Sequence, residues 1–180
     1  MKTINTRKDF FVGKDGLIIA ELGVFEGDFS KEILSVCTPE FLFMVDIFEG
    51  SCECTDTNKK NRVFIEDMSK VGDSLAFEYF YEENIAIIKK DSREFLKNVE
   101  NNFFDIVYID TLHEYQLTSK ELELCRNKVK PNGWITGHDY FEDFKGVMQA
   151  VDEFCAKYNL QINIKTTKDI CTSYFIKNIK

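Results

Sequence analysis

Short apolar runs alternate with amphipathic segments along the chain, and this alternation predicts the architecture. Five apolar runs are typical of buried strands, at residues 17–22, 41–46, 84–88, 103–110 and 134–137. Continuous apolar runs that are joined by helices indicate a mainly parallel sheet covered on both faces. We therefore expect an α/β fold in which residues 1–180 form one domain.

Two predicted helices have clear apolar faces. The first spans about 114–127, with apolar positions at Tyr115, Thr118, Leu122 and Cys125. The second follows the fifth strand and carries a longer stripe at spacings of three and four: Phe144, Val147, Met148, Val151, Phe154, Cys155 and Tyr158. We expect these faces to pack against the sheet. A further helix is expected to begin near Gly27 or Asp28.

The end of the chain predicts two more strands, at 160–164 and 171–176. Their connection, about 165–170, is too short for a helical crossover, so we expect them to pair antiparallel. Residues 131–133, Pro-Asn-Gly, are expected to turn the chain into the fifth strand. The pattern is weakest between 47 and 83, where 58–71 is predicted to be helical and 73–83 fits either a helix or a strand.

Composition limits the class of protein. The chain is 44% hydrophobic and has 17 Phe and 7 Tyr, enough for a packed core rather than a disordered chain. Its formal charge of −8 repels phosphate backbones, so we expect no nucleic-acid partner. No stretch approaches the roughly 18 to 20 apolar residues of a membrane span, and the first eight residues lack the apolar core of a secretory signal. We expect a cytoplasmic protein without membrane association.

The six cysteines are expected to be reduced, because disulfides are rare in the cytoplasm. They form no CxxC pair, and Cys52 and Cys54 are the one close pair. This spacing favours buried or loop thiols over a metal site.

The residues at strand ends are informative, because ligands of such sheets bind beyond the carboxyl ends of the strands. The first strand ends in Glu21-Leu-Gly23-Val-Phe-Glu-Gly27. Gly23 permits a tight turn and close ligand approach, and Gly27 leads into a helix. The spacing is not GxGxxG, so a dinucleotide is not the indicated ligand.

Two acidic residues follow at the ends of the next strands. Asp46 lies 23 residues after Gly23, where a carboxylate can accept both hydroxyls of a ribose. Asp91 and Ser92 lie after the third strand at a helix start, where Asp91 could equally be a helix cap.

This ordered set of residues resembles the class I S-adenosylmethionine-dependent methyltransferases, by motif from residue 17 to about 140 and by strand pattern beyond. The resemblance implies a Rossmann-like seven-stranded sheet in the order 3-2-1-4-5-7-6, with strand seven antiparallel. It implies that the Gly23 turn approaches the methionine moiety, Asp46 binds the ribose, and Asp91 with the Ser92 amide meets the adenine. The residues assigned to the cofactor are Glu21, Gly23, Gly27, Asp46, Asp91, Ser92 and Asp110.

In this fold the fourth and fifth strands are neighbours, so the residues at their ends should gather. The fourth ends in Asp110-Thr-Leu-His113 and the fifth in His138-Asp139, which include the only two histidines of the chain. A divalent cation lowers the pKa of an acceptor hydroxyl and orients it, and oxygen-rich ligands favour Mg²⁺ or Mn²⁺ over zinc. A neutral histidine can take the proton near pH 7. Alternatively, Asp110 caps a helix, His113 is a surface residue and His138-Asp139 is a loop turn.

The combination of DxxH and HDY is similar to a branch of metal-dependent O-methyltransferases that includes macrolide sugar enzymes and relatives of cephalosporin-hydroxylase type. The resemblance makes Asp110 and Asp139 metal ligands and His113 the base. Relatives often have an acidic residue where this chain has His138, so His138 either replaces a ligand, orients the substrate, or marks a site without metal. We assign His113, Asp110 and His138 to catalysis, and Asp110, Asp139 and His138 to a metal site.

The leading hypothesis is an S-adenosylmethionine-dependent O-methyltransferase with a sugar or glycan hydroxyl as acceptor. A catechol-type small-molecule methyltransferase and a non-catalytic nucleoside-binding module are the alternatives, and a nicotinamide-dependent oxidoreductase is the least expected. About 16 residues precede the first strand, which leaves little material for a lid. Residues 47–60 can supply part of the cover. A homo-oligomer can supply the rest, or the site is open to a large acceptor.

Overall fold

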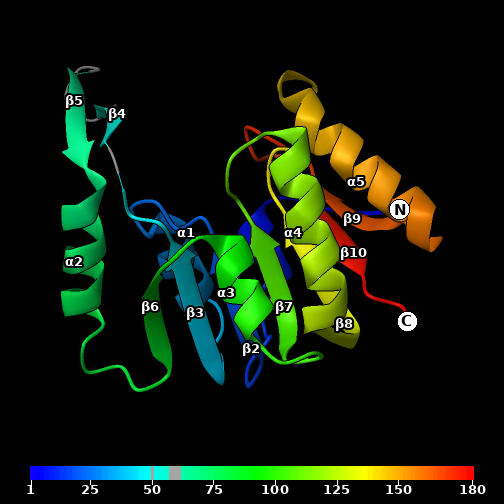
Figure 1. The fold of residues 1–180 in the computed structure, drawn as a ribbon, viewed down its shortest axis with the longest axis horizontal. Helices are drawn as coiled ribbons and strands as arrows, with labels where there is room; N and C mark the ends of the chain where they lie inside the picture. Colours follow the sequence, from blue (N-terminus) through cyan, green and yellow to red (C-terminus); the bar gives the residue numbers. More distant parts are fainter. Residues whose placement is uncertain (50, 57–61) are drawn as a thin grey trace.

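The main sheet has eight strands, in a computed structural model that describes residues 1–49, 51–56 and 62–180 (Figure 1). Its order is β1-β9-β10-β8-β7-β2-β3-β6, and β10 is antiparallel to both of its neighbours. The strands, in chain order, are β1 Lys2–Ile4, β2 Ile18–Leu22, β3 Phe41–Asp46, β6 Ile85–Lys89, β7 Phe104–Ile109, β8 Val129–Gly137, β9 Ile162–Thr166 and β10 Tyr174–Lys177. The order 3-2-1-4-5-7-6 is thus confirmed, and so is the antiparallel pairing of the last two strands.

The expectation of seven strands was wrong by one. The additional strand is β1, which pairs parallel with the outer edge of β9, with Lys2 opposite Ile164 and Ile4 opposite Thr166. A strand of three residues is too short to show a periodic pattern. Its conformation depends instead on a partner strand about 160 residues away in the sequence.

The region between 47 and 83 holds the largest correction. Strands β4 (Ser51–Asp56) and β5 (Arg62–Asp67) form an antiparallel pair, followed directly by helix α2 (Met68–Glu78). The helix predicted over 58–71 was therefore wrong for 62–67, while 58–61 lies outside the described residues. The segment 73–83 is helical as far as Glu78. The side chain of Asp67 accepts a hydrogen bond from the Ser69 amide at 3.1 Å and so marks the helix start.

Helices cover both faces of the sheet. Figure 1 shows α3 (Ser92–Asn98), α4 (Tyr115–Lys128) and α5 (Lys145–Tyr158) together on one face, where they contribute to one apolar core. The 3-10 turn η1 (Arg7–Phe10), α1 (Asp28–Leu34) and α2 contribute to a second core on the other face. A second 3-10 turn, η3 (Glu142–Phe144), leads into α5. No helix in the described part of the chain has the length and apolar character needed to cross a bilayer.

The turn expected at 131–133 lies inside a strand. β8 begins at Val129, and the register between β7 and β8 shifts between Phe104 and Ile106. Asn132 has a φ of 63°, so the tight turn forms as an irregularity within the strand.

Four cysteines of the described part of the chain are free thiols. Cys37, Cys125 and Cys155 are buried and Cys171 is half-buried. The side chains of Cys52 and Cys54 lie outside the part that the structure describes.

The apolar faces of the two long helices are mostly as predicted. On α5, Val147, Val151 and Phe154 are buried, at 4%, 0% and 3% exposure. On α4, Thr118, Leu122 and Cys125 are buried, but Tyr115 is 37% exposed, so its assignment to the buried face was wrong. Tyr115 is the first residue of α4, and its hydroxyl donates to Glu153 on the surface of α5.

We expect Phe154→Ala to lower the free energy of unfolding by about 3 to 5 kcal/mol, because a large buried ring leaves a cavity when removed. Urea denaturation measures the loss. Lys157→Ala, an exposed change on the same helix, should cost far less stability than Phe154→Ala. Equal losses in the two variants would contradict the burial of this face.

Candidate active site

A cleft of about 300 Å³ opens at the carboxyl ends of the central strands. Five of the seven residues assigned to the cofactor line it: Gly23, Asp46, Asp91, Ser92 and Asp110. Glu21 and Gly27 do not line the cleft. This is the edge of a parallel sheet at which ligands bind in such folds.

Gly23 brings the ends of β2 and β7 into contact. Its φ is +86°, and a Cβ atom at this position would lie 1.9 Å from the carbonyl oxygen of Asp110. The Gly23 amide donates to the carbonyl of Val45 at 2.8 Å. A side chain at residue 23 would therefore force the cleft wall apart. Gly27, with φ of +79°, is the N-cap of α1, as the sequence indicated.

Asp46 holds the turn that follows Gly23. One oxygen, Oδ2, accepts hydrogen bonds from the amides of Val24 at 2.8 Å and Phe25 at 3.0 Å. The other, Oδ1, accepts from the amide of Phe48 at 2.9 Å. Because each carboxylate oxygen has two lone pairs, Oδ1 of Asp46 retains the capacity to accept one further hydrogen bond from a ligand.

Asp91 is both a helix cap and part of the cleft wall. Its side chain accepts from the amides of Arg93 at 2.9 Å and Glu94 at 3.2 Å at the start of α3. The hydrogen bond from the Arg93 side chain, followed by these amide bonds, holds the pKa of Asp91 below its usual range despite some desolvation. The carboxylate is therefore ionised at neutral pH.

Glu121 of α4 is a cleft residue that the sequence analysis did not identify. It is 2% exposed and accepts hydrogen bonds from the hydroxyls of Ser92 and, at 2.7 Å, Thr111. Burial raises its pKa, opposed by these two hydrogen bonds. It was not identified because helical spacing alone does not distinguish a buried carboxylate from a solvated one.

Glu21 lies in the interior of the fold. It is 1% exposed, and the hydroxyl of Ser30 on α1 donates to it. Burial raises its pKa to about 8, opposed by the bond from Ser30, so the carboxyl is mostly protonated at pH 7. Glu21 thus connects β2 to α1 behind the glycine turn.

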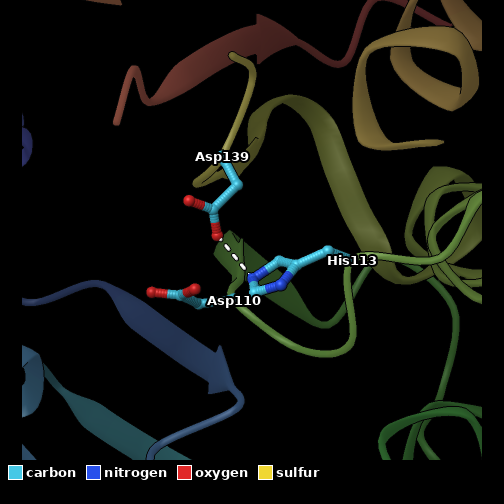
Figure 2. Close-up of side chains that lie close together, drawn as sticks. All are labelled: Asp110, His113 and Asp139. Carbon is cyan, nitrogen blue, oxygen red and sulfur yellow. Dashed lines mark ion pairs between the residues drawn. The ribbon is translucent and has the colours of Figure 1, made fainter. Parts of the chain in front are cut away.

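The polar residues at the ends of β7 and β8 come together as the sequence analysis expected. Figure 2 shows Asp110, His113 and Asp139 pointing toward one another, and each offers a ligand atom within 4.8 Å of the others. His113 Nε2 lies 2.7 Å from Asp139 Oδ2. His138 Nδ1 lies 3.0 Å from Asp139 Oδ1 and 3.8 Å from Asp110 Oδ1. Asp139, with φ of +58°, therefore stands between the two imidazoles.

The two carboxylates of this cluster have opposite electrostatic environments. Burial raises the pKa of Asp110, and the negative charge of Asp139 adds to that, while His138 and Arg7 oppose it. Burial also raises the pKa of Asp139, but the hydrogen bond and charge of His138 and the charge of His113 outweigh it, so the pKa is lowered. Asp139 is therefore the ionised partner that orients the imidazole of His113.

Arg7 is a second residue that the sequence analysis did not identify. Its Nη1 lies 3.0 Å from Asp110 Oδ2, and its guanidinium lies over the ring of Phe29, 4.0 Å from the centroid. Residues 7 and 110 are 103 positions apart, and Arg7 belongs to a segment without an apolar pattern. Nothing in the sequence signals this pairing.

The cluster fits a hard divalent cation by its donor chemistry. The two carboxylates are oxygen ligands of the kind that Mn²⁺ and Mg²⁺ favour, whereas the imidazole and the second imidazole adjoining it are nitrogen ligands more typical of transition metals. Asp110 lines the cleft beside Gly23 and Asp46 and also belongs to this cluster, so the cleft and the cluster share a wall.

The strand order, the antiparallel β10 and the cleft beside Gly23 and Asp46 define the architecture of a class I S-adenosylmethionine-dependent methyltransferase. A family model described as a methyltransferase domain matches residues 20–140, two thirds of the chain. The chain belongs to this family and is an S-adenosylmethionine-dependent methyltransferase. No curated protein matches the sequence.

Solved structures share the fold at low sequence identity. The N-methyltransferase NodS from Bradyrhizobium japonicum has a TM-score of 0.63 and 11% identity, with 97% of this chain and 95% of that chain covered. A Clostridium thermocellum protein proposed to be an rRNA methylase has a TM-score of 0.65 and 14% identity, with 100% and 99% covered. Aeropyrum pernix fibrillarin, solved with natively bound S-adenosyl-L-methionine, has a TM-score of 0.59 and 15% identity, with 90% of this chain and 66% of that chain covered. The range of these names shows that the fold alone does not select an acceptor.

Asp46→Ala is expected to weaken binding of S-adenosylhomocysteine, the demethylated cofactor, by about 1.5 to 3 kcal/mol, the scale of a hydrogen bond to a charged group. The expected loss combines the predicted ribose contact with the observed support of the Val24 and Phe25 amides. Titration calorimetry measures it, and Asp28→Ala, an exposed carboxylate outside the cleft, is the control. Unchanged affinity in a folded Asp46→Ala protein would remove Asp46 from the cofactor site.

Proposed function

We propose that this methyltransferase transfers the methyl group to a hydroxyl of a sugar or glycan. The observation that carries the proposal is the Asp110, His113 and Asp139 cluster on the wall of the cofactor cleft. A hydroxyl is a poor nucleophile, so its methylation needs a group that removes the proton. Transfer to a more nucleophilic amine would have less need of such a cluster, and a nucleoside-binding module would have none.

In the proposed reaction, Asp139 accepts the Nε2 proton of His113 in a hydrogen bond, which leaves Nδ1 with a free lone pair. His113 Nδ1 takes the proton of the acceptor hydroxyl as the hydroxyl oxygen attacks the methyl carbon of the sulfonium. The new O–C bond forms while the S–C bond breaks. Its electron pair stays on sulfur, so the products are a methyl ether, the neutral thioether S-adenosylhomocysteine and protonated His113. The ionised Asp139 stabilises this imidazolium, and the histidine returns its proton to solvent.

Asp110, Asp139 and His138 would hold Mg²⁺ or Mn²⁺, with His113 close by. Such a cation lowers the pKa of the acceptor hydroxyl and fixes its orientation. His138 points toward both carboxylates, which supports a role at the cation over a role in substrate contact alone. Arg7 and the two histidines contact these carboxylates and fix their geometry.

The surroundings of His113 support a large acceptor. Its side chain is 44% exposed, whereas that of Asp139 is 7% exposed, so solvent reaches the base but not its partner. Leu112 and Phe25 at the cleft are 63% and 47% exposed and offer apolar contact surface. The net charge of −8 disfavours polyphosphate acceptors, which supports a glycan or small molecule over nucleic acid.

The test is an acceptor screen with methyl-labelled S-adenosylmethionine. Monosaccharides, oligosaccharides, catechols and RNA are compared, and the labelled product is identified by mass spectrometry. We expect label in a methyl ether of a saccharide. Label found only in catechol would favour the small-molecule alternative, and label found only in RNA or in an amine would contradict the proposal. Binding of S-adenosylhomocysteine without any transfer in the screen would favour the binding module.

A further inference from the structure

The Asp110 carboxylate is divided between two neighbours. Oδ2 accepts from Arg7 Nη1 at 3.0 Å, while Oδ1 faces His138 Nδ1 at 3.8 Å. The backbone of Asp110 is already fixed, because its amide donates to Leu22 at 2.7 Å and Gly23 lies against its carbonyl. The remaining freedom of the residue is rotation of its side chain. The bond from Arg7 removes that freedom.

The N-terminal turn η1, which carries Arg7, is itself held against the sheet. Its backbone amide donates to Asp169 Oδ2 at 2.8 Å, in the connection between β9 and β10. The same connection is bonded to the end of β1, where the amide of Lys168 donates to Asn5 at 2.8 Å. Phe10, at the end of η1, is buried and stacks on Phe175 of β10, with centroids 4.2 Å apart. The turn that carries Arg7 is therefore anchored to the sheet and not a loose terminus.

The guanidinium is oriented on its other side by an aromatic ring. It lies over Phe29, which is 3% exposed and belongs to the first turn of α1. A planar cation between a carboxylate and a ring has one preferred orientation. The Arg7 side chain is 23% exposed and that of Asp110 is 22%, so the pair is shielded from solvent on most sides.

We propose that Arg7 is a positioning residue of the methyl-transfer site, which holds the Asp110 carboxylate by Oδ2 and so directs Oδ1 toward His138 and the cation. The inference rests on the proposed function for the cation and the hydroxyl acceptor. Removal of a residue that orients a metal-binding side chain typically lowers metal affinity or activity by about 10- to 100-fold. Arg7 acts through Asp110, and the N-terminal segment thereby belongs to the active site.

Positioning and simple charge make opposite predictions for a metal titration. If Arg7 only repels the incoming cation, removal of its charge tightens metal binding. If Arg7 positions Asp110, removal weakens it, because the carboxylate is free to turn away. Mn²⁺ alone is the probe, and Arg7→Met retains an unbranched apolar stem without the guanidinium or its charge.

We expect Arg7→Met to bind Mn²⁺ about 10-fold more weakly than wild type and to lower kcat about 10- to 100-fold. Affinity for S-adenosylhomocysteine should change by less than about threefold, since Arg7 is not on the cleft wall. Arg7→Lys should restore part of both losses, because lysine keeps the charge but not the planar fork. Lys8→Met removes a charge from the next position of the same turn. It should have the Mn²⁺ affinity and kcat of wild type.

Several outcomes overturn the inference. Mn²⁺ affinity that rises or stays equal in Arg7→Met contradicts positioning, as does an equal loss in Lys8→Met. Thermal unfolding shows whether each variant is folded. If Arg7→Met does not fold, the Mn²⁺ affinity of Arg7→Lys is compared with that of wild type instead. A wild-type protein that transfers no methyl group to a saccharide contradicts the proposed function instead. The Mn²⁺ affinities of wild type and Arg7→Met then test the positioning role of Arg7 without reference to methyl transfer.

Discussion

His113→Ala is expected to lower turnover by about 10² to 10⁴-fold, the usual contribution of a general base. His113 is the exposed imidazole of the cluster, and its Nε2 is paired with the ionised Asp139 at 2.7 Å. In the proposed reaction His113 is the group that takes the acceptor proton, and His138 is placed at the cation instead. Affinity for S-adenosylhomocysteine should hold within about threefold, because the cofactor cleft is lined by other residues.

The measurement is steady-state transfer of labelled methyl to the acceptor that the screen identifies. Glu114→Gln is the matched control, since Glu114 is the next residue, is exposed and makes no side-chain cap to α4. We expect the control to retain wild-type turnover. His113→Ala with wild-type turnover would show that the hydroxyl loses its proton by another route. A loss in both variants would point to disturbance of the loop before α4.

Removal of divalent cations is expected to abolish turnover while leaving cofactor binding nearly intact. Asp110 and Asp139 would no longer hold the cation that orients the acceptor hydroxyl, whereas the ribose and adenine are expected to bind near Asp46 and Asp91. Activity is assayed after treatment with a chelator and dialysis, and S-adenosylhomocysteine binding is measured in the same sample. Addition of Mg²⁺ or Mn²⁺ should restore transfer.

An Asp139→Asn variant tests the one residue that the proposed metal site shares with the Asp139–His113 pair. It should lose cation binding and also the ionised partner of His113, so added Mn²⁺ should not restore its turnover. If turnover is insensitive to the chelator but still needs His113, the Asp139–His113 pair is the proton acceptor and the proposed metal role is wrong. Turnover that survives both the chelator and His113→Ala would contradict the proposed roles of the whole cluster.

The sequence by itself predicted the parts of the fold that depend on local pattern. Apolar runs of four to eight residues marked the strands of the central sheet, and the stripe on 144–158 marked the buried face of α5. The Gly23 turn and Asp46 were recognisable because only certain residues satisfy a tight turn after a buried strand. The gathering of Asp110, His113 and Asp139 followed from the expected neighbourhood of two strands, which the structure has.

Tertiary structure alone decided the contacts between distant segments. β1 is a strand because β9 offers a free edge, and β5 is a strand because β4 pairs with it, although residues 58–71 had suggested a helix. Glu121 enters the cleft, and Arg7 reaches Asp110, because helix packing and the sheet edge bring them there. The Ser92–Glu121, Arg7–Asp110 and β1–β9 contacts join residues 29 to about 160 positions apart, so no local periodicity indicates them. Local propensity specifies individual elements, while the pairing of edges and the neutralisation of buried charge are settled only when the chain is folded.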